Sequence, residues 1–214
     1  MRRKLLLLGG GGHCKSVIDS LLTNNEFSEI GIVEKPGYEE DSILRIPVFG
    51  VDGDLPKLYD SGFTDAFVTL GSIGDTSVRR KLFSLITSIG FTIPNIIDSS
   101  ACVSINSRLG TGIFIGKHAV VNACAIIDDG AIINSAAVVE HDCHVGAFAH
   151  IAPGAILGGS VAVGTDTHIG TGVMIRQFVN IGKNTMVGMG SVVLHDVPGG
   201  VVAYGNPCEV IRVR

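Results

Sequence analysis

The hydrophobic positions between residues 103 and 193 repeat every six residues. Aliphatic side chains occupy sixteen consecutive positions at this spacing, without an exception or an insertion. These positions are Val103, Leu109, Ile115, Val121, Ile127, Ile133, Val139, Val145, Ile151, Leu157, Val163, Ile169, Ile175, Ile181, Val187 and Val193. Neither an α-helix nor a flat strand, with periods of 3.6 and two, produces this pattern. It predicts a solenoid of hexapeptides, in which each repeat forms one short strand and one turn.

The residues beside these aliphatic positions indicate a narrow core. Two places before the aliphatic residue the side chain is small at most repeats, as at Ala119 and Ala137, whereas Ile113 is large. Three hexapeptides make one coil, so the run predicts about five coils and a prism about 25 Å long at a strand spacing of about 4.8 Å. A prism this thin has a large surface for its volume. Packing about a threefold axis would bury part of that surface, so we expect a homotrimer.

The first ninety-odd residues have a different pattern, in which apolar strands alternate with amphipathic helices. Predicted strands are "KLLLL", "EIGIVEK" and "DAFVTLGS", and predicted helices are "KSVIDSLLTN" and "VRRKLFSLITSIG". This order predicts a small α/β domain with a Rossmann-like parallel sheet, which binds ligands at the carboxyl ends of its strands. The predicted division is an α/β domain at 1–97, a parallel β-helix at 98–197 and a tail at 198–214.

Composition and charge narrow the classes of function. The 214 residues carry a formal net charge of -4, so the chain lacks the basic field that favours nucleic acid. The opening "MRRKLLLLG" has only four leucines in a row and no cleavage pattern, so we expect a cytoplasmic protein without membrane insertion. The five cysteines are odd in number and lack C-x-x-C spacing, which favours reduced, structural thiols.

A glycine-rich loop, "GGGGHCKS" at residues 9–16, follows the first predicted strand. Cys14 stands where both the P-loop and the dinucleotide fingerprint require their last glycine, so the loop matches neither motif. Glu34 lies about twenty residues after the loop, where an acid commonly accepts hydrogen bonds from a ribose. A ribose ligand and a solvated strand end both remain open interpretations of Glu34.

One segment of the solenoid, "VVEHDCHVGAFAH" at residues 138–150, departs from the small and apolar pattern. It places five polar residues close together, namely Glu140, His141, Asp142, His144 and His150. A histidine can act as a base near neutral pH, and an adjacent carboxylate can raise its basicity and fix its tautomer. The segment is therefore the candidate catalytic site.

Two other interpretations of the solenoid histidines compete with catalysis. Most such histidines lie on exposed turns without a role, which we expect for His118, His144 and His168. A zinc site is the second interpretation, because His150 and His168 are 18 residues apart and would stack on successive coils. The sequence offers no evident third ligand, so we expect no metal.

Six segments, spread nearly from end to end, carry a family resemblance. They are "LLLGGGGHCKSVID", "RIPVFG", "IIDSSACVS", "EHDCHVGAFAHIAPGAILGG", "IGKNTMVGMGSVVLHDVPGG" and "YGNPCEVI". The chain resembles the bacterial hexapeptide acyltransferases of the sialic acid O-acetyltransferase type. That family includes N-acetyltransferases of nucleotide-linked 4-amino-4,6-dideoxy sugars of the bacillosamine, viosamine and perosamine type. The resemblance implies a left-handed β-helix and a trimer, with acetyl-CoA bound between adjacent subunits.

The resemblance also implies roles for residues of the solenoid. His141 would be the general base, and Asp142 would orient it. His150 would contact the thioester end of acetyl-CoA, and the backbone N–H of Gly159 would point at the thioester carbonyl. The remaining residues expected to bind acetyl-CoA are Gly188, Asn206 and Pro207.

At the other end of the chain, "GGGGHCKS" resembles the family loop that borders the nucleotide-sugar site. The residues expected to bind the nucleotide sugar are Gly10, Gly11, Gly12, His13, Glu34 and Lys35. The sequence departs from the family pattern at two positions there. Cys14 replaces a usual glycine, and Lys35 stands where a second acid is common.

These observations predict an acetyl-CoA-dependent N-acetyltransferase acting on the 4-amino group of a UDP- or dTDP-linked 4-amino-4,6-dideoxy sugar. We expect direct transfer, because no nucleophile for an acyl-enzyme is evident and Cys143 is at a core-facing position. The alternatives are O-acetylation of a sugar such as sialic acid, a metal-dependent lyase such as the γ-type carbonic anhydrases, and a non-catalytic solenoid that binds nucleotide sugars.

Overall fold

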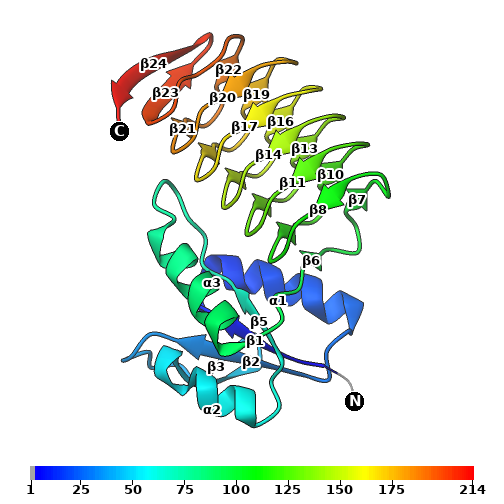
Figure 1. Ribbon diagram of the computed structural model, residues 1–214, viewed down its shortest axis with the longest axis vertical. Helices are drawn as coiled ribbons and strands as arrows, with labels where there is room; N and C mark the ends of the chain where they lie inside the picture. The colour runs from blue at the N-terminus through cyan, green and yellow to red at the C-terminus, as the bar shows by residue number, and fades with distance from the viewer. Residues whose placement is uncertain (1–2) are drawn as a thin grey trace. The chain divides into compact units, whose positions relative to one another are not determined.

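The computed structural model describes residues 3–214, which form two compact units. One unit extends to Ser72 and includes Ser77–Ile96; we call it the α/β unit. The other consists of Ile73–Thr76 and Ile97–Arg214; we call it the solenoid unit (Figure 1). Residues 73–76 therefore belong to the solenoid unit, although the chain on both sides of them lies in the α/β unit.

The α/β unit contains a five-stranded sheet with the strand order β3-β4-β2-β1-β5. Its strands are β1 (Lys4–Leu8), β2 (Glu29–Glu34), β3 (Ser42–Ile43), β4 (Ile46–Val51) and β5 (Asp65–Val68). β1 pairs in parallel with β2 and β5, and β2 pairs in parallel with β4. The four leucines of β1 are fully buried, as expected for a central parallel strand covered on both faces. The predicted parallel sheet is confirmed; β3 and β4 were not anticipated from the sequence.

Helix α1 (Gly12–Asn24) connects β1 to β2, and α2 (Leu55–Asp60), preceded by the 3-10 turn η1 (Asp52–Asp54), connects β4 to β5. Helix α3 (Ser77–Ile89) follows β5. Val17, Ile18 and Leu21 lie on the buried face of α1, whereas Leu22 is largely exposed. Asn25 ends α1 in the left-handed conformation and donates its N–H to the carbonyl of Leu21. No helix in residues 3–214 is long and apolar enough to cross a membrane.

The solenoid unit is a left-handed parallel β-helix of two-residue strands, arranged in three sheets that we name after their first strands. The β7 sheet contains β7 (Cys102–Val103), β10 (Val120–Val121), β13 (Val138–Val139), β16 (Ile156–Leu157), β19 (Met174–Ile175) and β22 (Val192–Val193). The β8 sheet contains β8 (Arg108–Leu109), β11 (Ile126–Ile127), β14 (His144–Val145), β17 (Ala162–Val163) and β20 (Asn180–Ile181). The β6 sheet contains β6 (Ile96–Ile97), β9 (Phe114–Ile115), β12 (Ile132–Ile133), β15 (His150–Ile151), β18 (His168–Ile169), β21 (Met186–Val187), β23 (Val201–Gly205) and β24 (Cys208–Val213).

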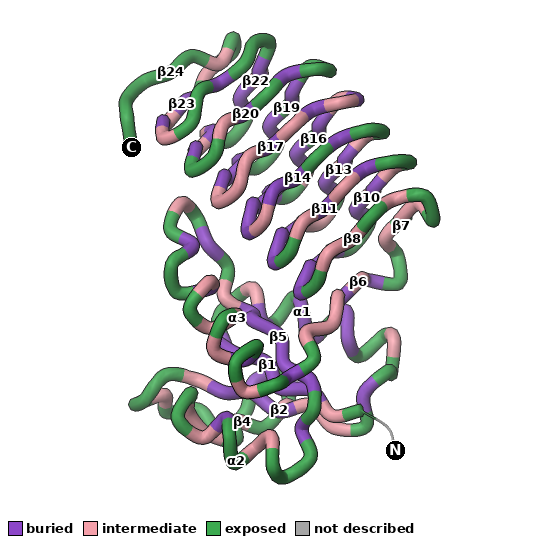
Figure 2. The backbone as a smooth tube through the Cα atoms, in the orientation of Figure 1, coloured by how far each residue is buried: buried purple, intermediate pink, exposed green. Residues whose placement is uncertain are grey.

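The register confirms the predicted coil of three hexapeptides. Val139 pairs in parallel with Val121 on one side and with Leu157 on the other, so each strand lies 18 residues from its partner. The second residue of each short strand points into the prism, and the aliphatic repeat with its small neighbours forms one continuous core. Figure 2 shows these buried positions recurring in every coil. Val103 and Leu109, in the first coil, are only partly buried.

The backbone conformation of the turns also repeats every six residues. From the turn that contains Gly112 to the turn that contains Gly190, one residue of each turn has a positive φ of 54–68°. These residues are Gly112, His118, Cys124, Gly130, Ala136, Asp142, Phe148, Gly154, Ser160, Asp166, Gly172, Phe178, Asn184 and Gly190. Residues other than Gly, Asn and Asp are disfavoured in the left-handed region. Several such residues adopt it here, because the stacked coils require this backbone conformation at each turn. Asp142 tolerates it well, and it is the carboxylate of the candidate catalytic segment.

Candidate active site

His141 and Asp142 occupy the turn between β13 and β14, at the corner where the β7 and β8 sheets meet. Their side chains are 60% and 58% exposed, so the pair is open to solvent. His141 Nδ1 lies 2.8 Å from Asp142 Oδ2. A carboxylate can only accept, so Nδ1–H donates this bond, and in the neutral form of the ring Nε2 carries the lone pair. The turn thus directs the Nε2 edge of the imidazole away from the carboxylate.

Gly159 lies directly above the His141 ring, on the next coil. A Cβ atom at Gly159 would lie 2.6 Å from both Nε2 and Cε1 of His141, so a side chain there would displace the ring from this position. Within residues 3–214, the backbone N–H of Gly159 has no hydrogen-bond partner. A candidate base and a free backbone donor therefore lie on neighbouring coils, an arrangement suited to proton removal and to stabilisation of developing negative charge.

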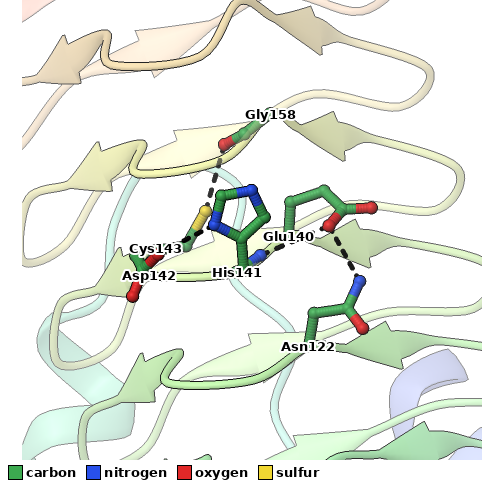
Figure 3. A network of polar contacts seen from close by, with 6 residues as sticks. All are labelled: Asn122, Glu140, His141, Asp142, Cys143 and Gly158. Atoms are coloured by element: carbon green, nitrogen blue, oxygen red, sulfur yellow. Dashed lines mark hydrogen bonds and ion pairs between the residues drawn. The ribbon is translucent and has the colours of Figure 1, made fainter.

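Glu140 supports the same turn from the strand side (Figure 3). Its Oε2 accepts a hydrogen bond from Asn122 Nδ2 at 2.9 Å and another from the His141 backbone N–H at 3.3 Å. Asn122 is 18 residues before Glu140, so it occupies the equivalent place on the previous coil. Asn122 was not predicted from the sequence, although its 18-residue spacing from Glu140 could have identified it.

Cys143, which follows the pair, is buried and donates its thiol hydrogen to the carbonyl of Gly158, with Sγ 3.2 Å from the oxygen. Burial raises the pKa of the Cys143 thiol to about 11. The thiolate, which is the nucleophilic form, is therefore scarce at neutral pH. Cys143 is unsuited to carry an acyl group, in line with the prediction of direct transfer.

His150 and His168 lie on the outer side of the β6 sheet, as the first residues of β15 and β18. Their rings meet edge to face, with centroids 4.9 Å apart, which confirms the predicted stacking. Both side chains are nevertheless buried, so the expectation that His168 lies on an exposed turn is wrong. Burial and the positive charge of Arg214 lower the pKa of His168, which keeps its ring neutral.

Asn134 fixes the tautomer of His150. Its Oδ1 accepts the backbone N–H of Ser135 at 2.8 Å, which directs its Nδ2 toward His150. The distance from Asn134 Nδ2 to His150 Nε2 is 3.1 Å. Because the amide nitrogen can only donate, Nε2 accepts and the ring carries its proton on Nδ1.

A cavity of about 200 Å³ opens beside these two histidines. Its remaining walls are mostly apolar, and they include Ile73, Met186, Gly188 and Met189. The structure thus brings together His150 and Gly188, both predicted to bind acetyl-CoA. Asn206 and Pro207 lie apart from this cavity, exposed at the tip of the hairpin formed by β23 and β24.

A single prism does not bring the predicted base and all the residues predicted to bind acetyl-CoA to one place. His141 and Gly159 lie at the corner shared by the β7 and β8 sheets, whereas His150 lies on the outer side of the third sheet. A corner and the opposite wall of a three-sided prism face different directions. A single site containing both parts requires a second copy of the chain.

In the α/β unit, the glycine loop joins β1 to the N-terminus of α1. A Cβ at Gly9 would collide with Leu70, and one at Gly10 with Ile43, whereas Gly11 and Gly12 have open space beside them. Helix α1 begins at Gly12 without a side-chain cap. Its first N–H groups and the open space beside them are suited to an anion such as phosphate.

Glu34 ends β2 beside this loop, and Lys35 follows it. The carboxylate of Glu34 accepts the N–H of Gly10 and, at 2.8 Å, the N–H of Lys35, so it shapes the loop as well as facing solvent. Both residues line a cavity of about 260 Å³ and a second one of about 180 Å³, which also contains Gly9, Asp52 and Leu70. The structure therefore groups the loop with Glu34 and Lys35.

His13 and Cys14 lie in the first turn of α1. Burial, and secondarily the positive charge of Arg79, lowers the pKa of His13 to about 4. Burial raises the pKa of the Cys14 thiol to about 11. Cys14 is fully buried, so its side chain belongs to the helix packing and leaves the loop surface to backbone groups. Across residues 3–214, no group of three or more His, Cys, Asp or Glu side chains is arranged to hold a metal ion.

A β-helix that carries an exposed histidine–carboxylate pair beside a free backbone N–H has the parts of an acyltransferase: a base and an oxyanion donor. Residues 4–86 match the family model of the PglD N-terminal domain. The acetyltransferase domain of PglB from Neisseria gonorrhoeae FA1090, solved with acetyl coenzyme A, is 34% identical with a TM-score of 0.92, over 99% of this chain and 100% of that one. The chain belongs to the hexapeptide-repeat sugar acetyltransferases and is an acetyl-CoA-dependent enzyme of that family.

Two further solved structures are similar over nearly the whole chain. PerB from Caulobacter crescentus, in complex with CoA and GDP-perosamine, is 36% identical with a TM-score of 0.79, over 98% of this chain and 97% of that one. WeeI from Acinetobacter baumannii AYE is 22% identical with a TM-score of 0.79, over 98% of this chain and 100% of that one. The similarity to WeeI shows that the two proteins share a fold.

Proposed function

We propose that the protein transfers the acetyl group of acetyl-CoA to the 4-amino group of a UDP- or dTDP-linked 4-amino-4,6-dideoxy sugar. The observation that carries this proposal is the His141 turn, where a free Nε2 lies against Gly159 and its unpaired N–H. The ligands of the relatives support the substrate class, because PerB was solved with CoA and GDP-perosamine. We also propose that the reaction takes place in the cytoplasm, as the sequence leads us to expect.

The proposed chemistry is a direct attack of the sugar amine on the thioester carbonyl. The C–N bond of the amide forms, negative charge develops on the carbonyl oxygen, and the Gly159 N–H stabilises that charge. His141 Nε2 takes the proton that the amine loses, while Asp142 holds the ring through Nδ1. The C–S bond then breaks, and the proton on His141 passes to the leaving CoA thiolate. No group of the enzyme carries the acetyl group.

We assign acetyl-CoA to the solenoid unit, with His150, Gly188, Asn206 and Pro207 as binding residues besides Gly159. The cavity beside His150 and Gly188 supports this assignment, because apolar walls suit a pantetheine arm and an acetyl group. A neutral His150 with its proton on Nδ1 can donate a hydrogen bond to the thioester end. The hairpin tip with Asn206 and Pro207 is exposed and free to contact the rest of CoA.

We assign the nucleotide sugar to the α/β unit. Gly10, Gly11 and Gly12 would present the backbone N–H groups at the start of α1 to the diphosphate. His13 is held neutral and would serve as a hydrogen-bonding group, while Glu34 and Lys35 would face the nucleoside from the end of β2. Lys35 is the unusual member of this set, because it adds a positive charge where a second acid is common in the family.

We further propose a homotrimer in which each active site is shared. The outward residues of the β7 sheet support it, because Val120, Val138, Ile156, Met174 and Val192 form an apolar row on a wall of this thin prism. Burying that row would compensate for the small core. A neighbouring copy would also join the His141 corner of one subunit to the His150 wall of the next, which one prism cannot do.

The experiment that tests the function is a CoA-release assay with acetyl-CoA and a panel of UDP-, dTDP- and GDP-linked 4-amino-4,6-dideoxy sugars, with sialic acid alongside. Rapid release with one nucleotide amino sugar, and an amide in the product, supports N-acetylation and identifies the nucleotide. Release only with sialic acid assigns the protein to sugar O-acetylation. Binding of a nucleotide sugar without any release assigns it to a non-catalytic role.

A further inference from the structure

A short segment connects β5 to α3 and belongs to the solenoid unit: residues Ile73–Thr76, which we call the strap. Two side chains of the solenoid hold it. Arg214 donates a guanidinium hydrogen bond to the carbonyl of Gly74, and the Thr76 hydroxyl donates to the carboxylate of Asp166. The strap is therefore fixed on the solenoid unit on the carboxyl side of Ile73.

Ile73, the first residue of the strap, lines the cavity that contains His150 and His168. Its side chain is apolar, yet 74% of the residue is exposed. Single exposed apolar residues are common on protein surfaces and need no explanation by themselves. This one differs because its backbone is anchored beside a cavity that also holds a neutral, oriented histidine.

The connection that ends in the strap also contributes to the other unit. Leu70 lines the cavity of about 180 Å³ that contains Gly9, Glu34 and Lys35. Ile73 follows it by three residues and lines the cavity with His150. One stretch of chain thus supplies a residue to the cavity assigned to the nucleotide and a residue to the cavity assigned to the thioester. An acceptor sugar attached to that nucleotide has to present its amine at the thioester.

We propose that Ile73 contacts the acceptor sugar and determines its specificity, favouring a methyl group at C6 over a hydroxymethyl group. This inference rests on the proposed function. An isoleucine side chain offers van der Waals contact to a methyl group and no hydrogen-bond partner to a hydroxyl group. A C6 hydroxyl placed against it would lose its water without replacement, which disfavours the hydroxylated sugar.

The test compares two acceptors that carry the same nucleotide: a 4-amino-4,6-dideoxy sugar and the corresponding 4-amino-4-deoxy sugar with its C6 hydroxyl. For the natural protein we expect kcat/KM to favour the 6-deoxy acceptor about tenfold or more, the range that a single apolar contact supplies. Ile73→Ala should reduce this ratio to about threefold or less, chiefly through a higher KM for the 6-deoxy sugar. The KM for acetyl-CoA should remain within about twofold.

Ile105→Ala is the matched control, because Ile105 is the same residue type and is 97% exposed on a solenoid turn. It should leave the ratio unchanged. A ratio near one in the natural protein, or a ratio that Ile73→Ala does not alter, overturns the assignment of Ile73. Absence of transfer to every nucleotide-linked amino sugar overturns the proposed function and this inference together, and it appears before any variant is compared.

A second measurement reports contact without turnover. In Ile73→Cys, the rate of modification of the new thiol by a maleimide is followed by mass spectrometry of its own peptide, which separates it from Cys102 and Cys124. We expect the nucleotide-linked amino sugar, added with CoA, to slow the modification at least fivefold relative to CoA alone. Equal rates with and without the sugar would show that the acceptor does not cover this position.

Discussion

The turn that carries His141 and the wall that carries His150 and His168 are built from the same hexapeptide, yet they place histidines in opposite environments. His141 is 60% exposed and paired with a carboxylate at 2.8 Å. His168 is only 7% exposed, lies against another histidine ring and has its pKa lowered by burial. The turn is suited to exchanging protons, and the wall is suited to keeping neutral rings in fixed positions.

This difference shows that the repeat fixes the position of a side chain but not its environment. His144, His150 and His168 are all first residues of two-residue strands and all point outward. His144 is exposed, whereas the other two are buried. Residues outside the repeat register, such as Ile73 in the strap, border the histidines of the wall. Burial on the outer side is therefore a property of the β6 sheet and its neighbours.

The largest expected effect comes from removing the proposed base. His141→Ala should lower kcat by about a thousandfold, because general-base catalysis contributes about 10²–10⁴-fold. CoA binding and the oligomeric state should be unaffected, since the ring is exposed. The control is His118→Ala, an exposed histidine on another turn, which should keep kcat within about twofold. Steady-state kinetics with the accepted sugar measure both; a loss of less than about fivefold at His141 would remove it from the role of base.

Gly159→Ala should lower kcat by about a hundredfold. The new Cβ would lie 2.6 Å from His141 Nε2, so the ring has to move and the N–H is no longer placed beside the base. A double-mutant cycle isolates this cause: in the His141→Ala background, where the ring is absent, the same substitution should cost much less. Equal losses in both backgrounds would mean that Gly159 acts independently of His141.

Asp142→Asn should lower kcat by about tenfold while preserving the turn. Asparagine tolerates the left-handed backbone that Asp142 adopts, but it replaces a charged acceptor with a neutral one. The chain offers a matched control, because His144 and Asp128 form a second exposed pair, with 2.9 Å between Nε2 and Oδ2, on the β8 sheet. Asp128→Asn should leave kcat within about twofold; similar losses at both sites would point to a general charge effect.

The buried wall predicts a pH effect on stability. The pKa of His168 is lowered in the folded protein from 6.5, so below about pH 6.5 the unfolded chain binds a proton that the fold excludes. The free energy of unfolding should therefore fall as pH falls through this range, by at most about 1.4 kcal/mol per pH unit for one proton.

His168→Gln should make this fall shallower, as measured by denaturant unfolding between pH 5 and 8 at fixed protein concentration. At pH 8 His168 is neutral in both the folded and the unfolded protein. The difference in unfolding free energy between the variant and the natural protein at that pH therefore reports packing alone. A slope identical to that of the natural protein would mean that His168 takes up its proton while folded.

The smallest expected effect concerns the anchor of the strap. Arg214→Ala removes the guanidinium that holds the carbonyl of Gly74 and should raise the KM for the acceptor about threefold, with Arg214→Lys restoring part of it. The other anchor, between Thr76 and Asp166, remains in both variants. An unchanged KM for the acceptor would show that this second anchor suffices.

The sequence predicted the solenoid well because its core depends on local period alone. The aliphatic repeat, the 18-residue coil and the stacking of His150 on His168 all follow from spacing. The strands β3 and β4 and the helix α2 were missed: β3 and α2 are short, and all three lie in a segment interrupted by glycine and proline. The burial of His168 was also missed, since a side chain on the outer wall is covered by residues far away in sequence.

The candidate site was predictable to a similar degree. His141 and Asp142 are adjacent in the sequence, so they could be recognised as a pair there. Asn122 and Gly159 lie near them only because the coils stack. The strap could not be foreseen, because the chain of the α/β unit gives no local sign that residues 73–76 belong to the solenoid unit.

The most direct test of the account is to follow the acetyl group itself. The protein is mixed with acetyl-CoA alone and its intact mass is measured; the accepted nucleotide-linked amino sugar is then added, and the CoA and the sugar product are quantified. Direct transfer at the His141 turn predicts an unmodified protein before the sugar is added, followed by equal amounts of CoA and N-acetylated sugar. A protein that gains an acetyl group without the sugar and loses it when the sugar arrives would contradict direct transfer.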